Sequence, residues 1–332
     1  MPKTPYTSQT TAEEACTALA EHIRGKRVLI TGPTSTSIGG ATALALASLP
    51  ATHHPSLLIL AGRNPATLET IVASIAEKAP SLRVRPVVLD LASQKSVRRA
   101  AEEVLADTSG VDVIINNAGV MACPYATTEE GVELQFGTNH LGHFLLTNLL
   151  IREMLERNGN RGKDGEVVRV VNVSSAGHKR GEVRFGDVGF ENGSVYDKWQ
   201  AYGQSKTANM LFSVALAGKL GGRGVISVSL YPDRVLSGIA RHLVLEEFVK
   251  AGWKTEDGKV VDDPKLNWRS LSQAAATLIV AGFEPSIAES NGSYLVNNHI
   301  ANDQAAAYAL SRGNAEKLWA HTEELVGEEF DL

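Results

Sequence analysis

Residues 27–42 read Arg27-Val28-Leu29-Ile30-Thr31-Gly32-Pro33-Thr34-Ser35-Thr36-Ser37-Ile38-Gly39-Gly40-Ala41-Thr42, a short apolar run followed by a turn of small residues. The run favours a β-strand, and an apolar helix is expected to begin near Ile38. Gly32 allows a tight turn, while Gly39 or Gly40 allows the helix to pack closely. This arrangement aims the N-terminus of a helix at a pyrophosphate group, although such a turn taken alone also fits an ordinary loop.

Outward from this turn, β-rich apolar runs alternate with longer segments of helical periodicity. The alternation predicts an α/β fold with a parallel sheet and helices on both faces. Several runs, such as Val111–Ile115, are almost continuously apolar, as in strands covered on both faces. The seven strands expected are Arg27–Thr31, Ser56–Ala61, Leu82–Val88, Val111–Asn116, Glu166–Ser174, Val225–Leu230 and Ser293–Val296. Helices are expected to start near Ile38, Pro65, Ser96, Thr128, Trp199, Ser270 and Asn314.

A single domain, residues 26–332, can hold all these strands, although length alone would allow two domains. Three segments lie outside the alternation of strands and helices. Residues 1–25 are predicted to form a loosely attached arm, and the polar residues 158–165 a surface connection. Residues 238–267 mix apolar and charged side chains after a strand end, where open α/β sheets bind their ligands. This third segment is therefore predicted to be a mobile cover over a substrate pocket.

The composition excludes several classes of protein. With 332 residues, 43% of them hydrophobic, and a formal net charge of −5, the chain is neither disordered nor collagen-like and should not attract nucleic acid nonspecifically. Its most apolar segments, Ala41–Ala51 and Leu141–Ile151, are shorter than the about 20 residues that span a bilayer. The polar residues 1–14 do not resemble a signal peptide. Only two cysteines, Cys16 and Cys123, suit a reducing compartment, so a cytoplasmic location is expected.

Two further motifs follow in order, Asn116-Asn117-Ala118-Gly119 after the fourth strand and Tyr202-Gly203-Gln204-Ser205-Lys206 on a helix. With the glycine-rich turn, they resemble the T-G-x3-G-x-G, N-N-A-G and Y-x3-K motifs of the short-chain dehydrogenase/reductase superfamily. Residues 136–144, Asn172-Val173-Ser174-Ser175 and Leu318-Trp319 resemble the branch that contains retinol dehydrogenases, the WW-domain oxidoreductase and many fungal reductases. The resemblance covers roughly residues 27–326. It implies a single-domain, doubly wound Rossmann-type sheet.

Tyr202 and Lys206 lie four residues apart, so on a helix they share one face, where an ammonium would lower the tyrosine pKa from about 10. Tyr202 could then exchange a proton with a substrate oxygen, which the Ser175 hydroxyl could also hydrogen-bond. The resemblance selects Ser175 over Ser174 and adds Asn139, which in this family helps to hold a water that links the lysine to solvent. Chance spacing on a helix, or a serine that caps a turn, would explain the same residues without catalysis.

The cofactor is predicted from the end of the second strand. Arg63 stands where an NAD-specific enzyme usually has an acidic residue, and it could pair with the 2′-phosphate of NADP(H). An ordinary surface arginine is the alternative. The cofactor contacts that the resemblance implies are Gly32, Thr34, Ser37, Ile38, Gly39, Arg63, Asp90, Leu91, Asn117, Ala118, Gly119, Tyr202, Lys206, Pro232, Val235 and Ser237.

Two positions depart from the family pattern. The glycine-rich turn is one residue longer than the common form, with Ser37 in place of its middle glycine. Asp233 stands where the family usually has a glycine close to the cofactor, which raises doubt about ordinary activity. His140 and His143 are three residues apart, but no cysteine or acidic partner has ligand spacing, so structural roles are expected and no metal site.

These observations predict an NADP(H)-dependent oxidoreductase that transfers hydride between the cofactor and a carbonyl or alcohol of an apolar small molecule, such as a specialised metabolite. One alternative is a redox-neutral isomerisation, cyclisation or epimerisation on the same fold. Another is a non-enzymatic NADP-binding sensor. No nucleic-acid partner and no transmembrane span are expected, and a homodimer is one option because relatives include dimers, tetramers and monomers.

Overall fold

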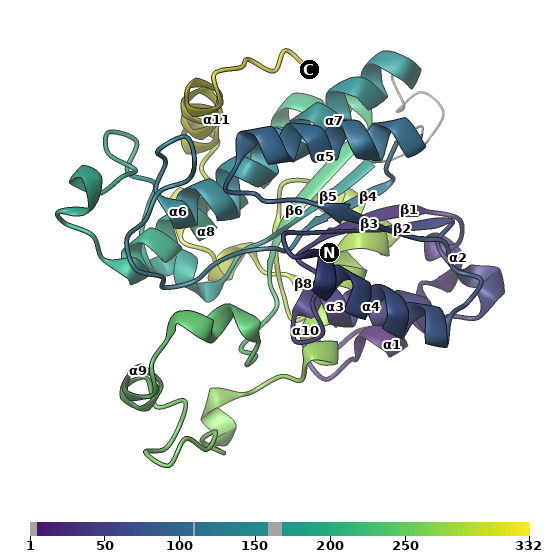
Figure 1. Ribbon diagram of the computed structural model, residues 1–332, viewed down its shortest axis with the longest axis horizontal. Coiled ribbons are helices and arrows are strands. Elements are labelled where there is room, and N and C mark those ends of the chain that lie inside the picture. Colours follow the sequence, from purple (N-terminus) through teal and green to yellow (C-terminus); the bar gives the residue numbers. More distant parts are fainter. Residues whose placement is uncertain (1–4, 109, 159–167) are drawn as a thin grey trace.

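A twisted sheet runs through the middle of the molecule in the computed structural model, which describes residues 5–108, 110–158 and 168–332 (Figure 1). Within these residues the sheet has eight strands in the order β3-β2-β1-β4-β5-β6-β7-β8. They are β1 (Arg27–Thr31), β2 (Leu57–Gly62), β3 (Val84–Val88), β4 (Val113–Asn116), β5 (Val168–Val173), β6 (Val225–Tyr231), β7 (Tyr294–Val296) and β8 (His299–Ile300). All neighbours pair in parallel except β7 and β8. The doubly wound α/β fold is confirmed.

All seven expected strands are present, with ends that differ from the prediction by a few residues. The short strand β8 is additional. It returns antiparallel to β7 through Asn297 and Asn298, whose φ angles are 49° and 71°. Two successive positive φ angles make a tight hairpin turn, which asparagine tolerates better than most residues. Residues 159–167, which include most of the predicted surface connection and the start of the predicted fifth strand, lie outside the described residues.

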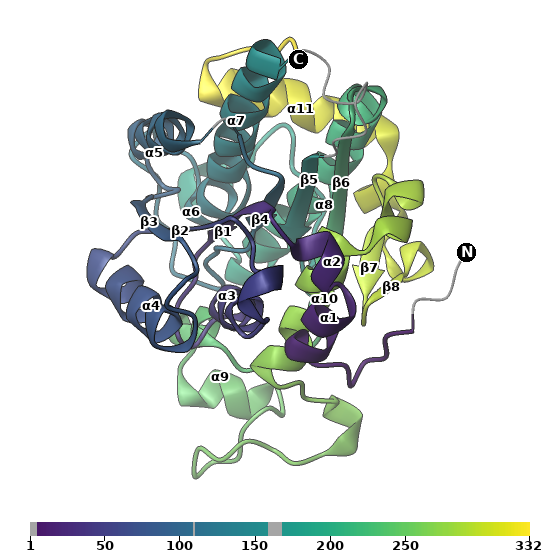
Figure 2. The same cartoon turned by 90° about the vertical axis from the view of Figure 1, so that its right-hand side faces the viewer.

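Helices cover both faces of the sheet, and Figure 2 shows the two layers on either side of it. Successive residues of β1 point to opposite faces, with Val28 and Ile30 in one apolar core and Leu29 in the other. The first core is closed by α1 (Ala12–Ala18), α2 (Ala20–Ile23), α3 (Ile38–Ala47), α4 (Pro65–Lys78) and α10 (Leu271–Phe283). The second is closed by α5 (Gln94–Asp107), α6 (Leu134–Phe136), α7 (Gly142–Asn158), α8 (Lys198–Leu220) and α11 (Arg312–Val326).

Most helices begin within two residues of the expected positions, because a polar residue caps them there. Ser37, Asn64 and Ser93 accept backbone hydrogen bonds at the starts of α3, α4 and α5. The expected helix near Thr128 is wrong. Thr127 pairs instead with Glu133 across a turn whose Gly131 has a φ of 82°, so the chain becomes helical only at Leu134.

The expectation of a loosely attached N-terminal arm is also wrong. Helix α1 is stabilised at its start by a capping box between Thr11 and Glu14. Its Ala12, Ala15 and Cys16 are fully buried and pack, with α3 and α10, into the core below the sheet. Small side chains at positions i, i+3 and i+4 let this short helix lie close to its neighbours.

The C-terminal helix α11 lies along α8 on the opposite face. Trp319 of α11 packs against Phe144 of α7 and Phe212 of α8, so α11 covers both of these helices. None of the helices in the described part of the chain is long and apolar enough to span a bilayer.

Candidate active site

The main cavity lies at the carboxyl ends of the parallel strands, has a volume of about 1200 Å³, and is bordered by β1, β2, β4, β5 and β6. The strand order reverses between β1 and β4, and open α/β sheets bind their ligands at this reversal. The cavity is lined by 16 of the 18 residues that the sequence analysis assigned to catalysis or cofactor binding. The other two, Gly39 and Asn139, lie just behind its wall.

The glycine-rich turn is shaped by two glycines. Gly32 has a φ of 68°, and a Cβ atom there would stand 2.9 Å from the Cα of Ala118. A Cβ on Gly40 would stand 1.9 Å from the Thr34 carbonyl oxygen. The turn therefore folds tightly against the end of β4 and leads directly into α3.

Ser37 explains how the turn tolerates its longer form. Its φ of −110° does not need a glycine. Its hydroxyl oxygen accepts hydrogen bonds from the backbone N–H groups of Thr34 (2.8 Å) and Gly40 (3.0 Å), and it lies 2.9 Å from the Gly32 carbonyl oxygen, to which it can donate. Ser37 thus caps α3 and closes the turn with one hydroxyl, a role that a glycine could not fill.

The Asn116–Gly119 motif is attached to the first strand by side-chain hydrogen bonds. The Thr31 hydroxyl oxygen accepts from the backbone N–H groups of Asn117 and Ala118, both at 3.0 Å, and the Asn117 amide donates to the Thr31 carbonyl oxygen at 2.8 Å. The same hydroxyl lies 2.8 Å from Nε2 of His143, whose Nδ1 donates to the Asn139 carbonyl oxygen. His143 therefore has the structural role that its sequence context predicts.

Tyr202, on α8, and Ser175, just after β5, both line the cavity, and the Ser175 hydroxyl lies close enough to the phenol to influence its pKa. The Ser175 hydroxyl oxygen also accepts from the Gly177 backbone N–H at 3.0 Å. A Cβ at Gly177 would come within 2.9 Å of the tyrosine ring. The 3-10 turn that begins after Ser175 thus packs the ring in place and fixes the relation between the two hydroxyl groups.

Lys206 lies one helical turn beyond Tyr202. Its Nζ donates to the Val173 carbonyl oxygen at 2.9 Å and lies 5.6 Å from the centre of the tyrosine ring. Burial lowers the pKa of Lys206 to about 7. Burial also raises the pKa of Tyr202 to about 12, with the neighbouring Ser175 hydroxyl acting in the opposite direction. The expectation of a lowered tyrosine pKa is therefore wrong for the protein alone, because desolvation of the buried phenol raises that pKa.

Asn139 lies in a single π-helical turn, Gly137–Leu141, between α6 and α7. Its side-chain oxygen accepts from the Val120 backbone N–H at 2.8 Å, and its Nδ2 donates to the Val120 carbonyl oxygen at 2.9 Å. A Cβ on Gly119 would stand 3.0 Å from Asn139 Oδ1 and 3.6 Å from Lys206 Nζ. The glycine of the motif thus leaves Asn139 and Lys206 close together, and π-turns of this kind are frequent at functional sites.

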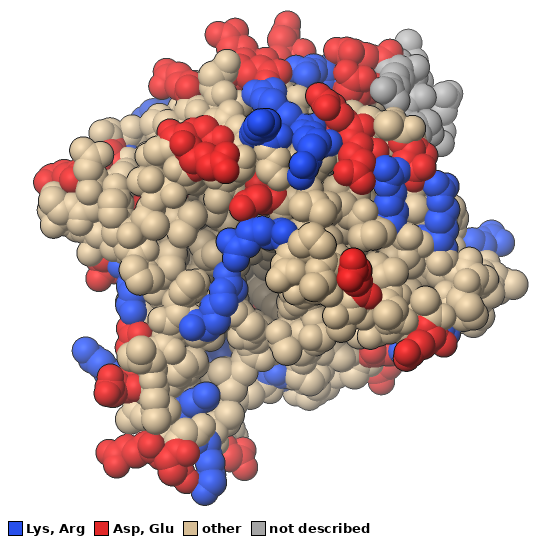
Figure 3. All heavy atoms as spheres, viewed as in Figure 1, with Lys and Arg blue, Asp and Glu red and all other residues tan. Residues whose placement is uncertain are grey.

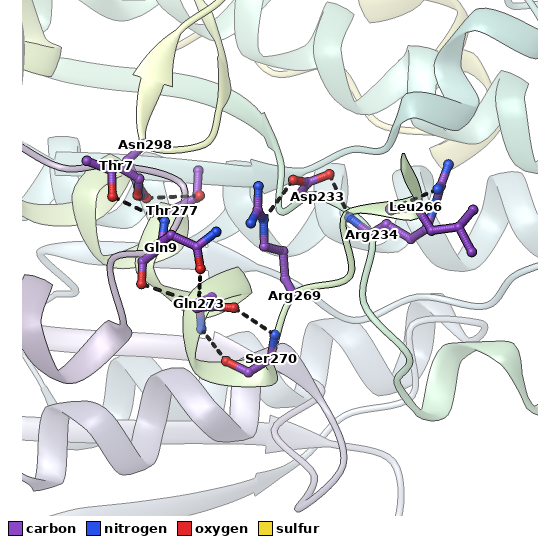
Figure 4. Close-up of polar contacts among 10 residues, drawn as sticks. All are labelled: Thr7, Gln9, Asp233, Arg234, Leu266, Arg269, Ser270, Gln273, Thr277 and Asn298. Atoms are coloured by element: carbon purple, nitrogen blue, oxygen red, sulfur yellow. Dashed lines mark hydrogen bonds and ion pairs between the residues drawn. The ribbon is translucent and has the colours of Figure 1, made fainter. Parts of the chain in front are cut away.

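Asp233, the second departure from the family pattern, follows β6 with a φ of 66°. Figure 4 shows its carboxylate between Arg269 and the backbone of Arg234. Oδ2 lies 2.9 Å from Arg269 Nε, and Oδ1 accepts from the Arg234 N–H at 2.8 Å. Aspartate is among the few residues that tolerate this backbone region, and the nearly buried Arg269 compensates its charge.

Residues of the predicted cover segment line the cavity opposite the sheet. The segment contains the 3-10 turn Gly238–His242, helix α9 (Leu245–Lys250), a bridge between Lys254 and Val260, and the 3-10 turn Pro264–Leu266. In Figure 1 it forms a lobe that projects from the body of the molecule. Its mobility stays a prediction.

An apolar wall surrounds the tyrosine. Met121, Ala122 and Tyr202 form a small core, against which Trp199, Ile239, Ala240 and Leu243 pack. Sequence reasoning named the cover segment but not its individual lining residues Arg241 and Trp253, and it missed Met121 and Trp268. The available signal was the position of the segment after β6. It placed residues 238–267 at the cavity but did not indicate which side chains face inward.

The described residues contain no group of three or more His, Cys, Asp and Glu side chains placed to hold a metal ion. His140 and His143 are both fully buried, and burial lowers the pKa of His140 to about 3 and that of His143 to about 4. Both imidazoles are therefore neutral near pH 7 and occupied in packing.

A family model described as short chain dehydrogenase matches residues 26–247. Retinol dehydrogenase 13 of Homo sapiens is 35% identical over 317 residues, covering 94% of this chain and 88% of that protein. Short-chain dehydrogenase TIC 32 A, chloroplastic, of Brassica napus is 34% identical, covering 98% of this chain and 95% of that protein.

Solved structures with the same fold were also found. An uncharacterized protein from Mycobacterium Paratuberculosis superposes with a TM-score of 0.67 and 30% identity, covering 93% of this chain and 96% of the other. The Pseudomonas aeruginosa RhlG/NADP active-site complex superposes with a TM-score of 0.59 at 20% identity, covering 83% of this chain and 96% of the other. The second likeness concerns the fold alone.

Proposed function

Because this chain belongs to the short-chain dehydrogenase/reductase family, in its retinol dehydrogenase-like branch, we propose that it is an NADP(H)-dependent oxidoreductase acting on a carbonyl or alcohol of an apolar small molecule. One observation carries the proposal. Ser175 and Tyr202 line the same cavity as the glycine-rich turn and Arg63. In the sheet, β1 and β4 lie between β2 and β5. Ser175, which follows β5, and Arg63, which follows β2, therefore border different parts of one cavity.

The residues present fit a dinucleotide. The turn ends at the N-terminus of α3, where free backbone N–H groups favour a phosphate. The described lining of the cavity includes six Lys and Arg side chains against three carboxylates, in a chain of net charge −5. NADPH, when bound, supplies a hydride for the substrate carbon, and NADP⁺ accepts one in the opposite direction.

Tyr202 is assigned the proton transfer. In reduction it donates its phenolic proton to the carbonyl oxygen, while the Ser175 hydroxyl donates a hydrogen bond to the same oxygen as negative charge develops there. In oxidation Tyr202 takes the proton back from the alcohol. Because both hydroxyls border the same cavity, one substrate oxygen is assigned contact with both.

Lys206 and Asn139 are assigned to the supply of that proton. A bound anionic cofactor would favour the ammonium form of Lys206, whose pKa burial has lowered, and this charge would then stabilise the tyrosinate. Lys206 is also assigned the contact with a ribose hydroxyl. Asn139, behind Gly119 and close to Lys206 Nζ, would complete a water-mediated path to solvent.

The preference for NADP(H) is assigned to Arg63. This side chain is exposed at the cavity rim after β2. A charge-assisted contact with the 2′-phosphate contributes about 1.5 to 3 kcal/mol, so Arg63→Ala should weaken NADPH binding roughly 10- to 150-fold and leave NADH binding nearly unchanged. Calorimetric titration of both cofactors into both proteins tests this. Equal affinity of the unmodified protein for the two cofactors would refute the assignment.

The apolar wall around Tyr202 supports an apolar substrate. The test is NADPH oxidation across a panel of hydrophobic aldehydes and ketones, with the products identified by mass. A two-hydrogen mass gain is expected for the reduced product. Isomerised products without cofactor consumption would favour the redox-neutral alternative, whereas cofactor binding without turnover of any compound would favour the sensor.

Three further expectations from the sequence stay proposals. A single catalytic domain over residues 26–332, a cytoplasmic location and the option of a homodimer rest on the sequence alone. The Ser37 hydroxyl is hydrogen-bonded within the turn and the Asp233 carboxylate is paired with Arg269, which supports the proposal that both departures are compatible with activity.

A further inference from the structure

The cavity has an excess of positive charge that its own carboxylates do not neutralise. Among the described lining residues, Asp233 is paired with Arg269 and Glu247 with Lys198, neither of which lines the cavity. The Asp90 carboxylate accepts from the Ala92 backbone N–H at 3.0 Å. Figure 3 shows Lys and Arg side chains gathered beside the hollow in the middle of this face. The positive lining therefore favours an anionic occupant.

Two arginines from separate elements contribute to this excess. Arg63 follows β2, and Arg241 lies in the 3-10 turn Gly238–His242 of the cover segment. Within the described residues neither has a carboxylate within 4 Å, and Arg241 Nη1 donates only to the Gly238 carbonyl oxygen at 3.2 Å. Both side chains are exposed at the cavity.

The two guanidinium groups also influence each other. Partial burial lowers the pKa of Arg241, and the charge of Arg63 acts in the same direction. Like charges that face one cavity repel each other unless an anion lies between them. The arrangement is thus more favourable with a bound anion than without one.

The turn that carries Arg241 touches the phosphate-binding turn directly. The Gly238 backbone N–H donates to the Thr36 carbonyl oxygen at 3.2 Å, and a Cβ on Gly238 would stand 3.0 Å from the Thr36 hydroxyl. A dinucleotide lying on residues 32–38 would therefore pass beside the start of the cover. Arg241, three residues further on, is long enough to reach a phosphate there.

We propose that Arg241 binds a phosphate of the dinucleotide opposite Arg63 and so fastens the cover segment over the bound cofactor. This inference rests on the proposed function. The shared chemistry is a phosphate, and two sources exist within one cofactor, the 2′-phosphate and the pyrophosphate. Either one would make cofactor binding close the lobe, which also bears Ile239, Ala240 and Leu243 of the apolar wall.

Calorimetric titration of NADPH and NADH tests the phosphate contact in the unmodified protein, Arg63→Ala, Arg241→Ala and the double variant. Lys259→Ala is the matched control, because Lys259 lies on the same segment, is highly exposed and pairs with Asp257. Arg241→Ala should weaken NADPH binding roughly tenfold or more, and the control should not. An equal loss for NADH would identify the pyrophosphate as the contact, whereas a loss confined to NADPH would identify the 2′-phosphate.

Chymotrypsin cleavage at Phe248 or Trp253 measures closure without turnover. NADPH should protect the segment in the unmodified protein and in Lys259→Ala, but not in Arg241→Ala. Normal cofactor affinity together with normal protection in Arg241→Ala would overturn the inference. If Arg63→Ala loses NADPH preference while Arg241→Ala keeps it and stays protected, only this inference fails; if the unmodified protein does not prefer NADPH, the proposed cofactor fails.

Discussion

Asp233 and Arg269 join the two ends of the cover segment. Asp233 follows β6 and stands shortly before the segment, and Arg269 stands between the segment and α10; their side chains meet at 2.9 Å (Figure 4). The Arg269 backbone N–H also donates to the Arg234 carbonyl oxygen at 2.8 Å, and Arg234 Nη1 donates to the Leu266 carbonyl oxygen at 2.9 Å. These contacts close the base of the lobe and fix its two ends relative to each other.

The same base is tied to the N-terminal segment. Just after Arg269, Ser270 and Gln273 form a capping box at the start of α10. The Gln273 amide donates to the Gln9 side-chain oxygen at 2.9 Å, and the Asn298 amide donates to the Thr7 carbonyl oxygen at 2.7 Å (Figure 4). The N-terminal segment before β1 thus supports the base of the cover segment. This support is a structural reason for the close packing of the N-terminal segment.

Replacing Asp233 with the glycine common in the family should destabilise this protein. Asp233→Gly relieves the positive φ, but it leaves the Arg269 guanidinium, 3% exposed, without its carboxylate. Breaking a buried ion pair on one side costs about 3 to 5 kcal/mol. Urea unfolding should show the loss, and Asp233→Gly combined with Arg269→Met should recover much of it. A single variant as stable as the unmodified protein would mean that the pair is not a stabilising clamp.

Removing the proton donor should separate catalysis from cofactor binding. Tyr202→Phe deletes only the phenolic hydroxyl, so turnover should fall roughly 100-fold or more while the Kd for NADPH changes little. Lys206→Ala should impair both, because it also removes the proposed ribose contact and leaves the Val173 carbonyl oxygen without that donor. Retained turnover in Tyr202→Phe would reassign the acid/base role.

The cover segment should influence substrate choice through particular side chains. Leu243 packs on the apolar cluster around Tyr202, whereas Leu245, two residues later, is 44% exposed. Leu243→Ala should raise KM for bulky apolar substrates relative to small ones, with the free energy of unfolding nearly unchanged, and Leu245→Ala is the matched control. Equal effects of the two variants on KM would show that the segment does not form a substrate wall.

The strands were predictable because their physical signal is local. Nearly continuous apolar runs such as that of β4 leave little choice other than a strand buried on both faces, and the motifs at strand ends then fix the site. The helix expected near Thr128 failed because apolar spacing there did not reveal the bridge from Thr127 to Glu133. The packing of α1 was missed because its contacts with α10 join residues more than 250 positions apart.

The site was predictable in composition but not in electrostatics. Motifs located Ser175, Tyr202 and Lys206, yet the direction of the tyrosine pKa depends on burial, which no spacing reveals. From the sequence, Asp233 suggested an unpaired charge at the site, because its partner, Arg269, is distant in sequence and could not be identified as such. Arg241 had no motif at all, and only the folded position of its turn beside Thr36 makes it relevant.

Acid should destabilise the protein through its buried histidines. Burial lowers the pKa of His140 from 6.5 to about 3, so the folded state binds fewer protons than the unfolded state between these pH values. Stability conferred by the neutral imidazole is therefore complete above about pH 6.5 and is lost as the pH falls, by up to about 1.4 kcal/mol per pH unit for each such histidine. His143 acts in the same direction down to about pH 4.

His140→Leu should reduce this dependence. His140 Nε2 lies 2.9 Å from the Thr322 hydroxyl, which itself donates to the Leu318 carbonyl oxygen, and His140 Nδ1 has no hydrogen-bond partner. A leucine would thus leave Thr322 satisfied and remove a buried group that protonates only at a cost. Urea unfolding from pH 7 to pH 4.5 should show a shallower loss of stability for His140→Leu than for the unmodified protein, with His22→Leu, at an exposed position, as control. Parallel curves for all three proteins would show that His140 is not a source of the acid sensitivity.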